Sequence, residues 1–200
     1  IDYTNGCGSL LLEPQRTNLI TYSESFDNAA WNKTNATSTD NSILSPDGTI
    51  NATLLNEGTL NNRHGVWKGI GSSGINTSSV FVKNKDRGFA NINLSNSDGS
   101  VYYQAVFDLT TGNSTQQNTN GAATNTSYSS TSYGNGWWRI SVTADVSTVA
   151  YVTISMSETG TFTPISYGYD SYQGSNKGIY LYGAQLEQSS YPTSYIISNS

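Results

Sequence analysis

Hydrophobic and polar residues alternate along much of this chain with a period of two. The clearest runs cover residues 100–109, 136–146, 150–157 and 178–187. Successive side chains of a β-strand point to opposite faces, so each run predicts a strand with one buried and one solvated face. Shorter runs of the same kind lie at 9–13, 64–70, 78–84 and 90–96.

Turn sequences separate these runs. Ser-Pro-Asp-Gly at 45–48, Ser-Asp-Gly at 97–99 and Tyr-Gly-Asn-Gly at 133–136 contain the residues that tight turns prefer. Many short strands joined by turns predict an all-β fold, an antiparallel two-sheet β-sandwich. Residues 113–132, rich in Ser, Thr, Asn and Gln, are either a long loop or a weak edge strand. The one helix candidate is a short turn at 23–31, where a serine can cap the helix.

The domain organisation follows from length and patterning. A chain of 200 residues is long enough for one substantial core, and it contains no internal repeat. We expect residues 1–8 to be a connector from a larger protein and residues 9–197 to form a single β-sandwich domain. The absence of a starting methionine and of a signal peptide favours a processed piece of something longer.

Composition narrows the function classes. Nine Lys and Arg residues against 14 Asp and Glu give a net charge of −5, so there is no basic stripe for nucleic acid or for an anionic membrane surface. No stretch approaches the roughly 18 apolar residues of a membrane span, so we predict no membrane insertion. The single cysteine, Cys7, and the single histidine, His64, leave little for a disulfide framework or a His-based catalytic triad. We therefore predict no catalytic residues.

Two acids and one arginine favour structural roles. Glu13 and Arg16 lie in "LLLEPQRTNL" beside apolar positions, and Glu187 ends a strand that is expected to be buried. A half-buried carboxylate needs a partner to offset its desolvation, and an ion pair of Arg16 with Glu13 or Glu187 would supply one. A structural Ca²⁺ tying the N-terminal segment to the last strand is the alternative. No metal ligands can be assigned from the sequence, and no other cofactor is expected.

Aromatic residues offer the best binding chemistry. Fourteen tyrosines and four tryptophans combine apolar rings with polar groups, and a groove of such rings can stack on the apolar faces of sugars. Adjacent Trp137 and Trp138 must point to opposite faces of a strand, and Trp138 lies on the stripe expected to be core. Tyr151 and Tyr180 are further candidates. We assign ligand binding to Trp67, Tyr102, Trp137, Tyr167, Tyr169 and Tyr172.

Five ordered motifs resemble a pattern found in phage and prophage tail or fibre proteins and in related bacterial surface proteins. They are "LLLEPQRTNLITYSESFDNAAW", "SPDGT", "SVFVKN", "GWWRISV" and "GIYLYGAQLE", with an E-x-x-R-T-N-L start and a G-A-Q-L-E end. The resemblance implies a jelly-roll β-sandwich like those of carbohydrate-binding modules, carried on larger structural proteins. It also implies that Trp31, Gln185 and Glu187, with Arg16, Asn18 and Arg139, are scaffold. Trp138 stands where the pattern more often has Tyr.

Three functional hypotheses follow. The leading one is a non-catalytic carbohydrate-binding or adhesion domain of a phage tail or similar structural protein, at the virion or at the cell surface. Its partner would be host surface polysaccharide, bound by aromatic stacking. The alternative is a purely structural decoration or oligomerising domain whose partners are other subunits of a fibre or particle, with a homotrimer among the open assemblies. The third is a polysaccharide lyase or hydrolase, for which no pair of carboxylates stands out in the sequence.

Overall fold

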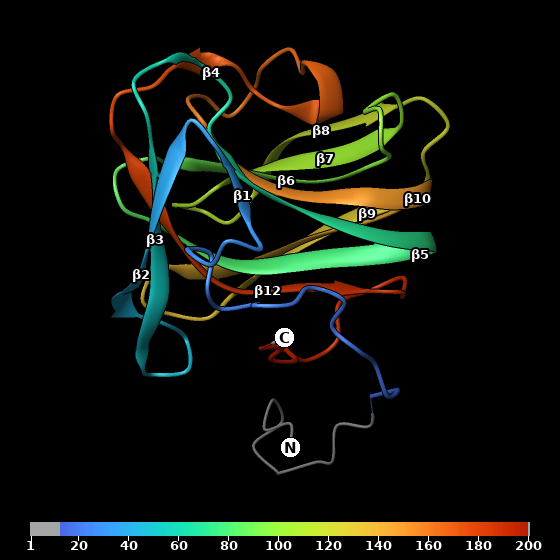
Figure 1. Ribbon diagram of the computed structural model, residues 1–200, viewed down its shortest axis with the longest axis horizontal. Helices are drawn as coiled ribbons and strands as arrows, with labels where there is room; N and C mark the ends of the chain where they lie inside the picture. Colours follow the sequence, from blue (N-terminus) through green and yellow to red (C-terminus); the bar gives the residue numbers. More distant parts are fainter. Residues whose placement is uncertain (1–12, 200) are drawn as a thin grey trace.

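Nearly all regular structure is β-strand in residues 13–199, the part of the chain that the computed structural model describes (Figure 1). A single turn of 3₁₀ helix, η1, covers Ser166–Gly168. The strands are β1 (Asn32–Thr34), β2 (Ala36–Leu44), β3 (Ile50–Glu57), β4 (Asn61–Asn62), β5 (Gly65–Asn84), β6 (Phe89–Ser95), β7 (Tyr102–Asp108), β8 (Ser114–Asn120), β9 (Thr124–Ser132), β10 (Trp137–Ser157), β11 (Tyr172–Gln173) and β12 (Gly178–Glu187).

The strands form two antiparallel layers. The first layer has the order β2-β3-β12-β5-β10-β9, and the second has the order β1-β5-β10-β6-β7-β8. Strands β5 and β10 belong to both, because the second half of β5 pairs with the first half of β10 in one layer and the remaining halves pair in the other. The predicted antiparallel two-sheet β-sandwich is confirmed.

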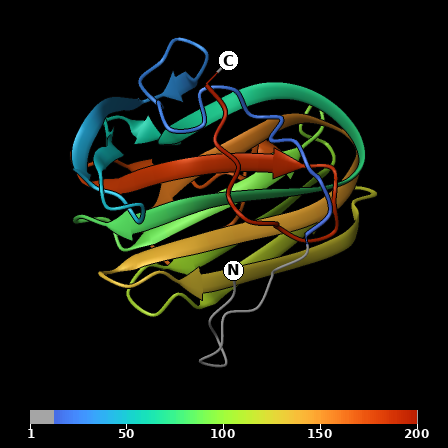
Figure 2. The ribbon, with the colours of Figure 1, turned by 90° about the horizontal axis from the view of Figure 1, so that it is seen from below.

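Strands β5 and β10 bend where they pass between the layers. The pairing shifts register between Asp145 and Thr148 and again between Val149 and Tyr151. Such bulges increase the local twist and bend the strand. Opposite them, Gly71 and Gly74 adopt φ angles of 88° and 72°, which cost residues with a side chain more than glycine. In Figure 2 both long strands turn together at one side of the sandwich.

The main core lies between the two layers. Its largest fully buried side chains include Phe107 and Ile92 of the second layer, Leu181 and Ile140 of the first, and Phe26 from the segment before β1. These residues occupy one parity of each strand, as the alternation of the sequence predicts. Trp31 also belongs to this core, which agrees with its expected scaffold role. Trp138 packs against the same core.

The outer face of the first layer carries a second, smaller cluster of Ala52, Phe81, Trp137 and Tyr182. The C-terminal segment covers it, since the ring of Tyr195 lies 5.5 Å from that of Tyr182. Polar side chains attach this segment to β12: Asn18 donates to the carbonyls of Ala184 and Ile196, and Gln185 accepts from the amide of Ile196.

The outer face of the second layer is covered differently. Residues 158–176, which carry η1 and β11, cross over this face, and Asn91 and Asn93 of β6 donate hydrogen bonds to the carbonyls of Gly168 and Tyr167. The side chains of β6, β7 and β10 on this face are mostly amides and hydroxyls. A loop therefore lies on a polar sheet surface.

Several expectations need correction. Residues 23–31 form bends and turns rather than a helix. The polar stretch 113–132 forms two edge strands, β8 and β9. Strands β2 and β3 were not predicted. Most residues of β2 are polar and all of them are at least partly exposed, whereas β3 contains buried residues. The predicted connector 1–8, Cys7 and most of the predicted strand 9–13 lie outside the described residues. Between residues 13 and 199, no helix has the length and apolar character to cross a membrane.

Candidate functional site

An aromatic pocket opens on the outer face of the second layer. It has a volume of about 120 Å³ and is lined by Arg63, Trp67, Tyr151, Tyr167 and Tyr169. We refer to these five residues as the aromatic pocket. Four of these five residues carry an aromatic ring. The pocket therefore brings together aromatic side chains that lie far apart in the sequence.

Two of the rings come from the sheet itself. Trp67 on β5 is the register partner of Thr153 on β10, and Tyr151 lies two residues earlier on β10, so both side chains point to the same face. Diagonal neighbours on a sheet are within reach when the side chains are aromatic. The two ring centroids are 5.2 Å apart at an interplanar angle of 84°. Both residues are half-buried, which leaves part of each ring open.

The other two rings come from the loop that crosses the sheet. Tyr167 has a φ of 65°, an uncommon value for a residue with a side chain, and its hydroxyl donates to the carbonyl of Ser97. Its ring lies 5.9 Å from that of Tyr151 and 6.1 Å from that of Tyr169. Tyr169 is buried and shares a hydrogen bond of 3.2 Å with Thr153. This burial raises the pKa of Tyr169 above its ordinary value.

Arg63 closes the pocket on its remaining side. It stands between β4 and β5, and its guanidinium carbon lies 4.5 Å from the centroid of the Tyr169 ring. Its backbone is fixed at both ends, since its amide donates to Asn62 and its carbonyl accepts from Asn35. Strand β4 pairs with β11, so the pairing of two loops holds the arginine over the ring.

The pocket offers flat apolar surface with polar groups at its rim. Within residues 13–199, the indole N–H of Trp67, the hydroxyl of Tyr151 and the guanidinium of Arg63 have no hydrogen-bond partner. Clefts for drug-sized ligands typically measure roughly 300–1,000 Å³, so this one can hold a single flat group rather than a large ligand. Such a site suits a ring that stacks on the aromatics and accepts hydrogen bonds at its edge.

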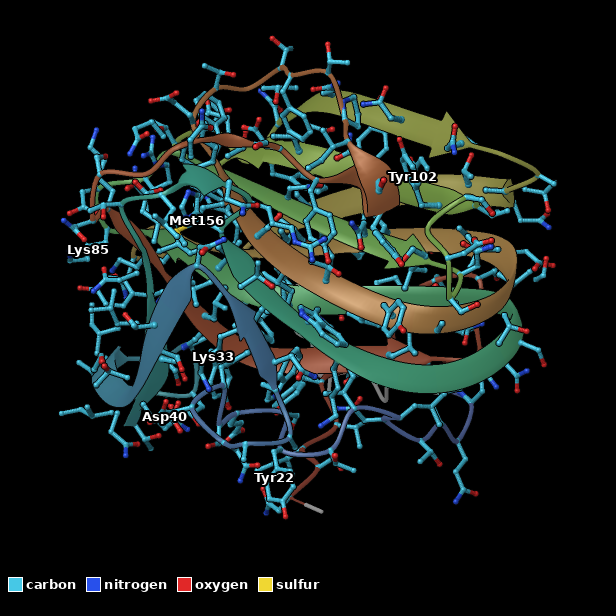
Figure 3. All side chains as sticks on the ribbon, turned by 45° about the horizontal axis from the view of Figure 1, so that its top comes forward. Tyr22, Lys33, Asp40, Lys85, Tyr102 and Met156 are labelled. Carbon is cyan, nitrogen blue, oxygen red and sulfur yellow. The ribbon has the colours of Figure 1, made fainter. Side chains whose placement is uncertain are left out.

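The structure brings together three of the six ligand-binding residues that the sequence predicted, namely Trp67, Tyr167 and Tyr169. Tyr151, a further candidate, lies with them, and Arg63 was not predicted. Tyr102 instead lies beneath the loop, where a Cβ atom at Gly168 would sit 3.0 Å from its ring. Figure 3 shows Tyr102 beside the segment that carries η1. Tyr102 therefore supports the loop and is not open to a ligand.

The expectation for Trp137 is corrected. Its face is the one predicted, opposite to Trp138, but the side chain is only 3% exposed. It packs in the outer cluster of the first layer, and its indole N–H donates to the carbonyl of Leu44. The β2–β3 hairpin, which the sequence pattern did not predict, supplies this cover. Trp137 is consequently a packing residue on the layer that does not carry the aromatic pocket.

The expectation for Tyr172 is also corrected. The side chain is buried, and its hydroxyl donates to Glu57 at 2.6 Å. The same carboxylate accepts from Arg87 Nε at 3.0 Å and from the amide of Ser175 at 2.8 Å. Burial alone would raise the pKa of Glu57, but the hydrogen bonds from Arg87, Tyr172 and Ser175 lower it to about 2. This buried network attaches the crossing loop to β3, and both of its carboxylate oxygens are already engaged.

The two acids predicted to have structural roles accept hydrogen bonds from neutral groups. Glu187 is fully buried and accepts hydrogen bonds from Gln185, from the amide of Thr193 and from the hydroxyl of Thr193. Glu13 is exposed and accepts from the amide of Ser194. Arg16 forms no ion pair with either acid among the described residues. Neutral donors therefore offset the charge of Glu187.

These contacts do not fit the predicted Ca²⁺ between the N-terminal segment and β12. Calcium takes six to eight oxygen ligands, whereas the oxygens of Glu187 face N–H and O–H donors. Across residues 13–199, no three His, Cys, Asp or Glu side chains gather in an arrangement that could hold a metal ion. Calcium binding stays a prediction.

An acidic cavity of about 310 Å³ lies elsewhere, lined by residues that include Tyr22, Glu24, Asp40 and Asn51. Figure 3 shows Tyr22 and Asp40 at the opposite end of the molecule from Tyr102. Asp40 accepts from the hydroxyls of Ser25 and Thr53, and Glu24 accepts from Tyr182. The carboxylates of this cavity are thus engaged in holding the β2–β3 hairpin to the rest of the fold.

Comparisons with known proteins give only distant similarities. No family model and no curated protein matches the chain. The enzymatically active domain of tailspike protein 4 from bacteriophage CBA120 aligns with 84% of this chain at 12% identity and a TM-score of 0.43, and this chain spans 21% of its length. A candidate sugar-binding protein from Bacteroides thetaiotaomicron aligns with 86% of this chain at 10% identity and a TM-score of 0.40, over 95% of its own length. Similarities this distant say nothing about what this chain binds.

Proposed function

We propose that this chain is a non-catalytic carbohydrate-binding domain that recognises a surface polysaccharide through the aromatic pocket. The observation that carries the proposal is the convergence of Trp67, Tyr151 and Tyr167 around one opening beside Arg63, which forms no ion pair with any residue that the structure describes. Aromatic rings stack on the apolar faces of sugar rings, while the indole N–H, the phenol and the guanidinium can donate to hydroxyl groups.

We infer further that the domain is carried on a larger extracellular or virion protein, such as a phage tail or fibre. The five motifs that resemble the tail and fibre pattern support this setting, as does a surface poor in charge. A shallow site of this size binds weakly by itself. Repeated copies on one particle would raise the effective affinity by 10²–10⁴-fold without any new contact.

The proposal is tested by affinity electrophoresis and calorimetry against an array of bacterial surface polysaccharides. Trp67→Ala and Tyr151→Ala are each expected to weaken binding by at least about tenfold, since each removes a ring from the centre of the pocket. Tyr191→Ala is the matched control, because Tyr191 is 48% exposed and lies outside the pocket. If the parent binds no polysaccharide, or if both pocket variants bind as well as the parent, the proposal fails.

The alternative function is a structural domain that contacts other subunits. The edge of the first layer favours it: among residues 13–199, β9 pairs with β10 alone, and its residues are almost all exposed. Open edge strands can add a strand from another chain, although the many short polar side chains here give little apolar surface for a stable interface. Light scattering gives the oligomeric state, and affinity electrophoresis gives polysaccharide binding. A stable trimer that does not bind polysaccharide would favour the structural function.

A further inference from the structure

The arginine of the aromatic pocket is available for binding, which distinguishes it from Arg87 and Arg139, the two buried arginines of the fold. Arg87 forms an ion pair with Glu57, and Arg139 donates to the carbonyl of Thr193 and to Ser79. The guanidinium of Arg63 makes neither a hydrogen bond nor an ion pair with any residue from 13 to 199, although its ring contact with Tyr169 is close. Its N–H donors are therefore available to a ligand.

A ring contact places this guanidinium over Tyr169. The Tyr169 ring below it is buried and anchored through Thr153, and the backbone of Arg63 is fixed by Asn62 and Asn35. An arginine stacked on a ring keeps the N–H groups at the edge of its plane free to donate. Because the ring contact restricts the side chain, less conformational entropy is lost when it binds an anion than for an arginine without such a contact.

Nearby acids do not neutralise the site. Asp170, on the same loop, is buried and accepts from the hydroxyl of Ser157 and the amide of Glu158. Neither Asp170 nor Glu158 forms an ion pair with Arg63 within the described part of the chain. A chain of net charge −5 thus presents an unpaired cation at the opening where four rings meet.

We propose that the pocket selects an anionic sugar, a saccharide that carries a carboxylate, with its ring on Trp67 and Tyr151 and its carboxylate on Arg63. This inference rests on the proposed function and deepens it by naming the substrate class. The planar fork of a guanidinium matches a carboxylate in a bidentate pair, and such charge-assisted bonds are about twice as strong as neutral ones. A neutral sugar could not form this ion pair with Arg63.

The test uses matched pairs of oligosaccharides that differ only in the charged group. Tetragalacturonate, a hyaluronan tetrasaccharide and sialyllactose are each titrated into the parent domain beside their carboxyl-reduced counterparts, at low and at high salt. At least one acidic member is expected to bind about tenfold to a hundredfold more tightly than its reduced counterpart. The preference should shrink at high salt, because screening weakens an exposed ion pair.

Variants assign the preference to one residue. Arg63→Gln is expected to abolish the preference for the acidic member, and Arg63→Lys to restore only part of it, because lysine lacks the fork. Lys177→Gln is the matched control, since it removes the same charge from an exposed position outside the pocket. Trp67→Ala should weaken acidic and reduced members alike.

The outcomes separate the two proposals. If no acidic member binds better than its reduced counterpart, or if Arg63→Gln keeps the preference, the anionic-sugar inference is overturned. If neutral polysaccharides still bind the parent and lose affinity in Trp67→Ala, the proposed function stands without it. If neither acidic nor neutral carbohydrates bind, both proposals fail together.

Discussion

At the scale of single residues, the polar face under the crossing loop contains side chains that the fold does not satisfy. Trp67, Thr153, Asn93 and Gln104 stand side by side on four neighbouring strands, so the row begins at the aromatic pocket and continues beneath the loop. Gln104 is fully buried, and neither its amide nitrogen nor its amide oxygen has a hydrogen-bond partner among residues 13–199. A buried polar group without a partner costs roughly 1–3 kcal/mol.

Replacing this glutamine should therefore stabilise the domain. In Gln104→Met the side chain keeps a similar length and loses its unpaired amide, so we expect the free energy of unfolding to rise by about 1 kcal/mol. Urea unfolding, followed by tryptophan fluorescence, measures the change.

Gln185 provides the matched control for that substitution. It is also fully buried, but its amide donates to Glu187 and Ser194, and its oxygen accepts from Ile196. Gln185→Met should lower the free energy of unfolding by about 1–3 kcal/mol, because several buried groups lose their partners. Equal losses in the two variants would contradict the assignment and show that Gln104 is paired, for instance through an ordered water.

At the scale of elements, the position of the loop ring depends on a turn of the neighbouring hairpin. Gly99, in the turn between β6 and β7, has a φ of 71°, and a Cβ atom there would lie 2.7 Å from the ring of Tyr167. The hydroxyl of Tyr167 donates to Ser97 in the same turn. The turn thus contacts the ring of Tyr167 at Gly99 and its hydroxyl at Ser97. These two contacts position Tyr167 in the aromatic pocket.

Gly99→Ala is expected to displace Tyr167 and weaken polysaccharide binding several-fold, in addition to lowering stability. Gly48→Ala is the control, because Gly48 has a φ of 86° and a Cβ atom there would meet nothing within 4 Å. Both variants carry the backbone cost of a left-handed residue, about 1–2 kcal/mol, but only the first adds a clash with the ring. Urea unfolding and affinity electrophoresis report the two effects. Identical behaviour of the two variants would show that the ring moves without consequence.

The alternation of the sequence predicts strands well where one face is buried and poorly elsewhere. Strands β6, β7 and β12 follow the predicted runs closely. Residues 71–77 separated the predicted strands 64–70 and 78–84, yet β5 continues through them, since its pairing with β10 is a long-range contact that local patterning does not contain. Strand β2 was missed for a related reason, because an exposed edge strand has no apolar face to recognise.

The residues of the candidate site likewise include some that local sequence patterns indicate and others that only long-range contacts bring there. The alternation along 150–157 sets Tyr151 opposite the apolar stripe of its strand, because parity along a strand is a local property. That Tyr151 lies beside Trp67 depends on the pairing of β10 with β5. Arg63 carries no such signal: only the pairing of β4 with β11 brings it over Tyr169. Tyr172 looked like a loop ring in a Gly- and Ser-rich segment, but the carboxylate that buries it lies 115 residues away in the sequence. Contacts at that distance are not readable from a single sequence.

At the scale of the whole molecule, one buried network joins the crossing loop to both layers of the sandwich. Glu57 ends β3 in the first layer, Arg87 precedes β6 in the second, and Tyr172 and Ser175 belong to the loop. Breaking a buried ion pair is costly because the remaining charge is left unpaired, typically by 3–5 kcal/mol. The attachment of the pocket loop and the stability of the whole domain therefore depend on the same carboxylate.

This dependence predicts how stability changes with pH. Although burial opposes it, hydrogen bonding from Arg87, Tyr172 and Ser175 lowers the pKa of Glu57 from 4.5 to about 2, so the folded state favours the ionised form. The stabilisation is present above about pH 4.5 and is lost as the pH falls from 4.5 towards 2. Its size is on the order of 3 kcal/mol. Urea unfolding at a series of pH values should show this decline in the parent domain.

In Glu57→Gln the titrating group is removed, so the variant should be less stable than the parent at pH 7 and should decline less steeply between pH 4.5 and 2. The two curves are expected to converge in acid, because a protonated Glu57 and a glutamine leave Arg87 equally unpaired. Parallel curves over that interval would assign the acid sensitivity to other carboxylates, such as Asp47 and Asp86, whose pKa values hydrogen bonds also lower against the opposing effect of burial. Convergence would establish that the acid sensitivity of the sandwich comes from the ionisation of Glu57, the side chain that also anchors Tyr172 and Ser175 of the pocket loop.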